Sequence, residues 1–286
     1  MAVVFAILTA ISNAVAVATQ HIASTSEAGR SSGRRLIAFL IHHPLWLAGW
    51  VAMAGSLVFQ ATALHFGPLS IVQPLLVTEL VVALALRRIW LRQTIRAITW
   101  WAALVTGVGL VSFLVATSPS GGDTVPSASK WLTSSIVVAA GAAALLLAGK
   151  FGTPARRAAL FASATAMLWA LEATFIKSST DVLTSFGVSG LFVRWPLYAL
   201  IGAGLIGLWT EQAALHVGPL SVSQPIIVIV DPVVSVALGV WLYRERLHPG
   251  AWHYSIGACA FAVMCVGIVV LTRSAPPTMS SEIHRL

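Results

Sequence analysis

The sequence predicts an all-α, polytopic membrane protein with about nine transmembrane helices, and composition is the first reason. The chain has 286 residues, of which 58% are hydrophobic and 9% are charged, and its mean hydropathy is +0.88. A soluble domain carries about 25% charged residues. A chain this poor in charge cannot cover its surface with polar groups, so most of that surface must contact lipid.

The spacing of the apolar stretches is the second reason. The hydrocarbon core of a bilayer is about 30 Å thick and needs roughly 20 apolar residues per helix. Stretches of this length predict nine helices, near residues 2–22, 44–64, 69–88, 97–116, 131–149, 157–178, 192–213, 219–242 and 252–272.

A motif that occurs twice is the third reason. Residues 63–74 read ALHFGPLSIVQP and residues 214–225 read ALHVGPLSVSQP, at a constant offset of 216 − 65 = 151 positions. Nine of the twelve pairs are identical, and they include His, Gly, Pro, Ser and Gln. Shared hydrophobicity does not explain such matches. Each copy lies between two apolar stretches, which indicates two related halves.

The repeat divides the chain into a first four-helix unit, a linker with the fifth helix, a second four-helix unit and a tail. Their predicted ranges are 1–116, 117–150, 151–273 and 274–286, and the tail is expected to be disordered and cytoplasmic. Four helices return the chain to its starting side, and the fifth carries it across. The second unit therefore begins on the opposite face, which predicts a 4+1+4 inverted repeat.

Basic residues set the expected orientation. Twelve of the 17 Lys and Arg residues fall on the side that holds the C-terminus, namely Arg30, Arg34, Arg35, Arg87, Arg88, Arg92, Arg96, Lys150, Arg156, Arg157, Arg273 and Arg285. The positive-inside rule then predicts a multi-pass protein of the plasma membrane with its N-terminus outside and its C-terminus in the cytoplasm. Arg244 and Arg246 go against this orientation, and Glu245 partly offsets them.

The net charge of +8 raises the question of a nucleic-acid partner. No basic stretch alternates with aromatic or Gly-rich soluble sequence, so no nucleic-acid partner is expected. The expected partners are membrane lipid and a small-molecule solute or cation, and the chain leaves room for a homodimer. Cys259 and Cys265 lie within one apolar stretch without metal-ligand or disulfide spacing. The sequence predicts no metal site and no cofactor, and it shows no nucleophile–base pair that would indicate an enzyme.

Acidic residues at bilayer depth are the first site candidates. Four of the nine acids fall within predicted helices or at their edges: Glu79, Glu172, Glu211 and Asp231. An ionisable group at that depth costs at least ~2.5 kcal/mol on insertion scales, so it faces the protein interior or water, pairs with another group, or holds a proton. We predict that Glu79, Glu172 and Asp231 line a central site and exchange protons against substrate, with Glu211 as a secondary candidate.

Structural roles for these acids stay open. Lys177 lies five residues after Glu172 and could partly neutralise it. Asp231 precedes a proline, so it could belong to a local polar bend. Glu79 is eight and nine residues from the nearest arginines, which is too far for a bridge within one helix.

The repeated motif supplies the second group of candidates. Gln73 and Gln224 each precede a proline just inside a helix, and the missing proline N–H frees a carbonyl in the preceding turn. Both glutamines are expected to orient substrate or to form hydrogen bonds between helices. His65 and His216 precede the Gly-Pro turns and could gate protons or orient the turn. The remaining secondary candidates are Asn13 and Gln20.

The motif also resembles a known junction. Ala-Leu-His-Phe-Gly-Pro-Leu-Ser-Ile-Val-Gln-Pro ahead of the third helix is similar to the junction found in the drug/metabolite transporter (DMT) superfamily. So are Asp231-Pro232, the later Leu242-Tyr-Arg-Glu245-Arg-Leu, and Gly257 in the last helix. Most EamA-like members have ten helices, and the nine-helix layout is more similar to NIPA-like magnesium transporters. Gln-Pro stands at both junctions here, where Thr-Pro is usual.

The resemblance implies a secondary carrier that works by alternating access. Because acids lie in the expected cavity and no arginine lies at mid-span, the residues favour a small cationic or zwitterionic metabolite, with proton or cation coupling. Two alternatives stay open. One is a NIPA-like magnesium or divalent-cation transporter, for which one or two carboxylates would suffice. The other is a non-transporting membrane scaffold or lipid-handling subunit.

Overall fold

The computed structural model describes residues 1–27, 43–90, 94–122, 126–217, 220–248 and 250–274. These residues form helices, with one isolated bridge between Ser120 and Arg246. The helices are α1 (Ala2–Glu27), α3 (Pro44–Phe66), α4 (Leu69–Leu76), α5 (Thr78–Ile89), α6 (Ala97–Thr117), α7 (Ala128–Ala148), α8 (Pro154–Val193), α9 (Trp195–Val217), α10 (Leu220–Leu242) and α11 (Ala251–Ser274). The all-α prediction is confirmed for the described residues, and most of the tail predicted over 274–286 lies outside them.

The membrane-protein prediction is confirmed at the level of helix length and apolarity. Eight segments of the described chain are long and apolar enough to cross a bilayer, with α4 and α5 counted as one segment, Leu69–Ile89. The remaining predicted helix, 192–213, corresponds to α9, which has 23 residues but is not among the eight. Large apolar side chains face outward, as lipid-facing residues do: Val51 is 73% exposed, Val115 70% and Trp209 66%.

The sixth predicted helix, 157–178, is much too short. The corresponding α8 has 40 residues and contains one break, where Gly187 has φ 70° and ψ −175°. Residues 178–184 read SSTDVLT, and Ser and Thr often favour turns over helix interiors. In the structure, the hydroxyl groups of Thr180 and Thr184 donate to the carbonyls of Ile176 and Thr180, four residues back, so they follow the helix instead of ending it.

The third predicted helix, 69–88, contains a break. It is divided at Val77 into α4 and α5, three residues after Pro74. The Val77 N–H donates to the Pro74 carbonyl at 3.2 Å, and the Thr78 hydroxyl donates to the Leu75 carbonyl at 2.6 Å. By contrast, α10 continues through both Pro225 and Pro232. The two copies of the motif therefore lead into differently shaped helices.

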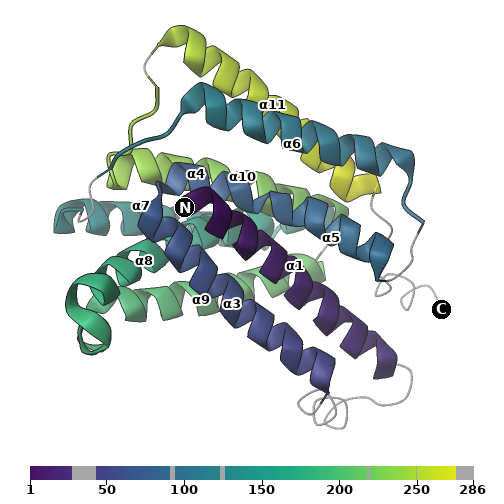
Figure 1. Cartoon of the computed structure of the whole chain (residues 1–286), viewed down its shortest axis with the longest axis horizontal. Coiled ribbons are helices and arrows are strands. Elements are labelled where there is room, and N and C mark those ends of the chain that lie inside the picture. Colours follow the sequence, from purple (N-terminus) through teal and green to yellow (C-terminus); the bar gives the residue numbers. More distant parts are fainter. Residues whose placement is uncertain (28–42, 91–93, 123–125, 218–219, 249, 275–286) are drawn as a thin grey trace.

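Helices of the two halves pair in a repeated pattern (Figure 1). In the first half α1 packs against α3, α4 and α5, and in the second half α8 packs against α9 and α10. Across the halves, α4 packs against α10 and α6 against α11. The helix that follows each copy of the motif thus meets its counterpart, and the last helices of the two halves pair along their length.

Both cross-half pairs are antiparallel. Leu69 and Ser70, at the start of α4, contact Glu245, which follows the end of α10. Because α4 continues alongside α10, the two helices run in opposite directions. Along the other pair, Thr99 at the start of α6 lies against Ser274, and Thr117 at its end lies against Gly257.

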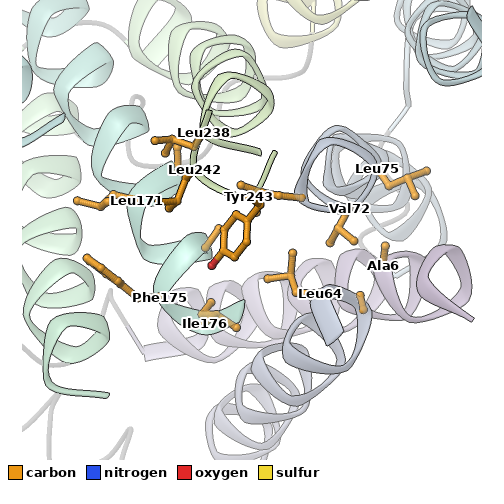
Figure 2. Packing of buried hydrophobic residues seen from close by; sticks show 14 of the residues in the cluster. Ala6, Leu64, Val72, Leu75, Leu171, Phe175, Ile176, Leu238, Leu242 and Tyr243 are labelled. Atoms are coloured by element: carbon orange, nitrogen blue, oxygen red, sulfur yellow. The ribbon is translucent and has the colours of Figure 1, made fainter. Parts of the chain in front are cut away.

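The main core lies where α4, α8 and α10 meet, close to the end of the bundle where α3 leads into α4 (Figure 2). We call this the junction end. Tyr243 is fully buried there, and its hydroxyl donates to the Thr174 carbonyl of α8 at 2.8 Å. Burial raises the pKa of the Tyr243 phenol well above its usual range, so the group stays protonated and keeps this hydrogen bond. Leu242 and Leu171 pack beside its ring.

The α6–α11 interface makes a clear stability prediction. A Cβ added at Gly109 would lie 2.5 Å from the Met264 backbone nitrogen and 2.9 Å from the Ala260 carbonyl oxygen, so the two helices must separate. We expect Gly109→Leu to lower the free energy of unfolding by about 1–3 kcal/mol. The check is thermal unfolding in detergent. Gly107→Leu on the same helix is the matched control, because a Cβ there meets nothing within 4 Å. Equal effects of the two substitutions would contradict the predicted close packing.

Candidate functional site

Helix α8 places one of the predicted acids against α9. Trp169 and Glu172 are three residues apart and lie on one face of α8. The facing residues of α9 are glycines: a Cβ at Gly204 would lie 3.1 Å from Glu172 Oε1, and a Cβ at Gly207 would lie 3.2 Å from the Trp169 ring. Small residues allow the two backbones to approach closely. The Glu172 carboxyl group therefore lies within the α8–α9 interface.

A second acid of the set lies on α9, and a third lies on α5. Glu211 lies one turn beyond Gly207, close to the Trp169 side chain. It also lies within electrostatic range of Glu79 on α5. Glu79 Oε2 in turn accepts a hydrogen bond of 2.7 Å from Asn13 Nδ2 on α1. Asn13 and Glu211, both secondary candidates, are thus joined to Glu79.

The fourth acid comes from α10. Asp231 lies within electrostatic range of Glu172. Its Oδ1 accepts a hydrogen bond of 3.1 Å from the Ser235 hydroxyl one turn later. We call Glu79, Glu172, Glu211 and Asp231 the acid cluster. The cluster joins helices of both halves. Helix α8 connects the Glu79–Glu211 pair to the Glu172–Asp231 pair, because Trp169 lies close to Glu211 and Glu172 belongs to the second pair.

No basic side chain of the described residues forms an ion pair with the acid cluster. The two ion pairs found there are His65–Asp181 at 3.7 Å and Lys177–Glu245 at 3.3 Å. Lys177 therefore pairs with Glu245, and the expected alternative in which it neutralises Glu172 is wrong. Each acid therefore carries a negative charge or holds a proton, and no basic side chain in the described part of the chain pairs with it. This arrangement can attract a cation or exchange protons.

The two glutamines of the repeat lie in different surroundings. Gln73 is buried, at 2% exposure, and its Nε2 has no hydrogen-bond partner. Gln224 is exposed on α10. The placement of Gln224 therefore does not support the expected role of lining a central site, whereas Gln73 has an unused donor. The sequence repeat could not separate them, because only their tertiary neighbours differ.

The remaining secondary candidates lie away from the acid cluster. His216 is exposed near the end of α9. Gln20 contacts α3, since a Cβ at Gly49 would lie 2.6 Å from its Cγ, and its Nε2 is buried without a partner. His65 is half-exposed at the junction end, 3.7 Å from Asp181.

Glu245 forms a polar centre that the sequence reasoning missed. Its side chain is completely buried. The N–H groups of Leu69 and Ser70 donate to Oε1 and Oε2 at 2.6 and 2.9 Å, and the Ser70 hydroxyl donates to Oε2 at 2.6 Å. Lys177 Nζ lies 3.3 Å from Oε1 and also donates to the Gly67 carbonyl. A residue of the second half thus caps the helix that follows the first motif.

The junction end also contains a cavity that the sequence did not predict. Its volume is about 660 Å³, and α3, α7, α8 and α9 contribute to its lining, which includes His65, Trp131, Asp181, Ser185, Arg194 and Trp195. A smaller cavity of about 260 Å³ shares His65 and Asp181 with it and reaches Gly67 and Lys177. We call the larger one the junction cavity. Asp181 and Ser185 lie beyond the predicted end of the sixth helix, so the pattern of apolar stretches gave no reason to single them out.

Within the described ranges, no group of three or more His, Cys, Asp or Glu residues is arranged to hold a metal ion.

The comparisons with known proteins identify a relative and no family. The chain is 28% identical over 243 residues to an uncharacterized protein of Corynebacterium glutamicum, and the match covers 84% of this chain and 83% of the relative. No protein-family model matches the sequence, and no solved structure matches it significantly.

Proposed function

We propose that the chain is a secondary transporter of the DMT superfamily that moves a small cationic or zwitterionic metabolite by alternating access. The acid cluster is the observation that carries this proposal. Glu79 on α5 lies within electrostatic range of Glu211 on α9, Glu172 on α8 lies within range of Asp231 on α10, and none of the four has a basic partner among the described residues. Burying such groups costs free energy, so they need a compensating function, and proton exchange against a solute supplies one.

The antiparallel pairing of α4 with α10 supports an inverted repeat. Two halves that cross the membrane in opposite directions allow a central site to open first to one side and then to the other. The interruption of the helix at Val77, where the backbone φ and ψ stay helical, lies two residues before Glu79. The proposed orientation, in the plasma membrane with an outside N-terminus, places the junction end outside.

A divalent-cation carrier is the nearest competing function, and a non-transporting scaffold is the next. Hydrated Mg²⁺ is bound through one or two carboxylates and keeps several waters. Glu172 and Asp231 would provide such a pair. A scaffold requires no acids without counter-charge at bilayer depth, so the acid cluster favours a carrier over it.

A solute screen in proteoliposomes on a solid-supported membrane tests the proposal. We expect electrical currents or pH changes on addition of cationic or zwitterionic solutes, and we expect them to depend on an imposed pH gradient. Transport of Mg²⁺ alone would replace the proposal by the divalent-cation function. Protein-containing liposomes that behave like empty ones with every solute would favour the scaffold.

Cysteine labelling tests the architecture separately. Cysteines placed at His65 and His216, equivalent and exposed positions of the two motifs, are expected to react with impermeant reagents from opposite sides of the membrane. Cys259→Ala/Cys265→Ala provides the background, because the chain has two cysteines. Labelling of both positions from one side would contradict the inverted repeat.

A further inference from the structure

The junction cavity is separate from the acid cluster and carries two opposite charges. Asp181 and Arg194 both line it, one from α8 and one from the turn between α8 and α9. Its volume of about 660 Å³ lies within the usual range of small-molecule sites, about 300–1,000 Å³. It is large enough for a metabolite rather than for an inorganic ion alone.

Asp181 has free capacity to accept hydrogen bonds. Its Oδ1 lies 3.7 Å from His65 Nδ1, which is too long for a hydrogen bond, and its Oδ2 is buried without a partner. The other cation near Asp181 is Lys177. Lys177 is already bound to Glu245 and to the Gly67 carbonyl, so it does not satisfy Asp181.

Arg194 provides the opposite charge in a fixed position. Its guanidinium carbon lies 3.6 Å from the centre of the Phe186 ring, a cation–π contact that holds the group against the cavity wall. Stacking leaves the edge of a guanidinium group available for hydrogen bonds, and this edge suits a carboxylate. Trp131 and Trp195 form an aromatic part of the lining, with ring centroids 5.1 Å apart.

This combination distinguishes between classes of ligand. A free cation would be attracted by Asp181 and repelled by Arg194. A free anion would be attracted by Arg194 and repelled by Asp181. A molecule with an ammonium group, a carboxylate and a flat apolar body satisfies both charges and covers the aromatic wall. We propose that the junction cavity is a binding site for a zwitterion with an aromatic or flat apolar body. This deepens the proposed function, on which it rests, by naming a substrate class and an entry site.

Indole compounds that differ mainly in charge provide the test. L-tryptophan and the dipeptide Trp-Gly are zwitterions with narrow and wide charge spacing, tryptamine is a cation and 3-indolepropionate is an anion. Equilibrium binding to the purified full chain in nanodiscs is measured at about pH 7, where the α-amino groups of both zwitterions are mostly protonated. We expect one of the zwitterions to bind about tenfold or more tightly than both single-charge compounds.

Two variants assign the binding to the cavity. Asp181→Asn is expected to weaken zwitterion binding about tenfold. Arg194→Gln is expected to weaken zwitterion binding by a similar factor and to strengthen the binding of tryptamine. Arg88→Gln is the matched control, because Arg88 is an exposed arginine at the end of α5, far from the junction end. Circular dichroism and gel filtration confirm that each variant is folded.

The outcomes separate this inference from the proposed function. Binding that persists in Glu172→Gln while transport is lost supports both. Equal affinity for all four indoles, no binding of either zwitterion at millimolar concentration, or unchanged binding in Asp181→Asn overturns the junction site, whether or not transport is observed. Zwitterion binding without any transport would leave the site in place and refute the carrier.

Discussion

Replacing Glu245 with alanine is expected to lower the free energy of unfolding by about 3–5 kcal/mol. The carboxylate accepts three hydrogen bonds from the start of α4 and one from Lys177, and the side chain is completely buried. Alanine would leave the two N–H groups without an acceptor and would leave a buried ammonium group without a counter-charge. Because Glu245 joins the two halves at the junction end, the loss also separates them.

A graded series separates these contributions. Ser70→Ala removes one hydrogen bond and should lower the free energy of unfolding by about 1 kcal/mol. Glu245→Gln keeps one acceptor oxygen, so its loss of stability should fall between those of Ser70→Ala and Glu245→Ala. Thermal unfolding in detergent, followed by circular dichroism, ranks the three variants by their loss of stability. If Glu245→Ala were no more destabilising than Ser70→Ala, the cap between the halves would carry little of the stability.

The membrane class could be predicted from the sequence because it depends on composition and apolar length, which are local properties. Helix ends were harder. The Ser/Thr-rich residues after Lys177 are compatible with either a loop or a helix, and hydroxyl groups bonded four residues back continue α8. The break at Val77 follows from Pro74, yet Pro225 and Pro232 lie in a continuous α10. Proline alone therefore did not determine where a helix is interrupted.

Some residues of the candidate site stand out in the local sequence, and others depend on contacts with distant parts of the chain. Acids at bilayer depth are rare enough to stand out in one dimension, and the structure places Glu79 within electrostatic range of Glu211 and Glu172 within range of Asp231. Glu245 was missed because it follows an apolar helix between two arginines, where a surface charge is also common. Its partners, Leu69 and Ser70, lie 176 and 175 positions away. A contact over that distance leaves no local pattern.

Glu172→Gln is the second substitution with a large expected effect, and it should change stability and transport in opposite directions. Glu172 lies in the α8–α9 interface near Asp231, and no basic side chain of the described residues pairs with it. A neutral amide of the same shape removes an uncompensated ionisable group, so the free energy of unfolding should stay the same or rise. Removing the group also removes a proton-exchange site, so uptake driven by a pH gradient should fall to the level of protein-free liposomes.

The contrast with Glu245 makes this result informative. A carboxyl group that serves only the fold should lower stability when it becomes an amide, as expected for Glu245→Gln, and transport would then fall only with the amount of folded protein. Asp231→Asn is the matched variant of the same pair, and it should behave like Glu172→Gln although it loses the acceptor for Ser235. Stability and uptake are measured on the same preparations. A Glu172→Gln protein that is less stable and still accumulates solute would show that the acid cluster serves packing, and the carrier mechanism would lose its main support.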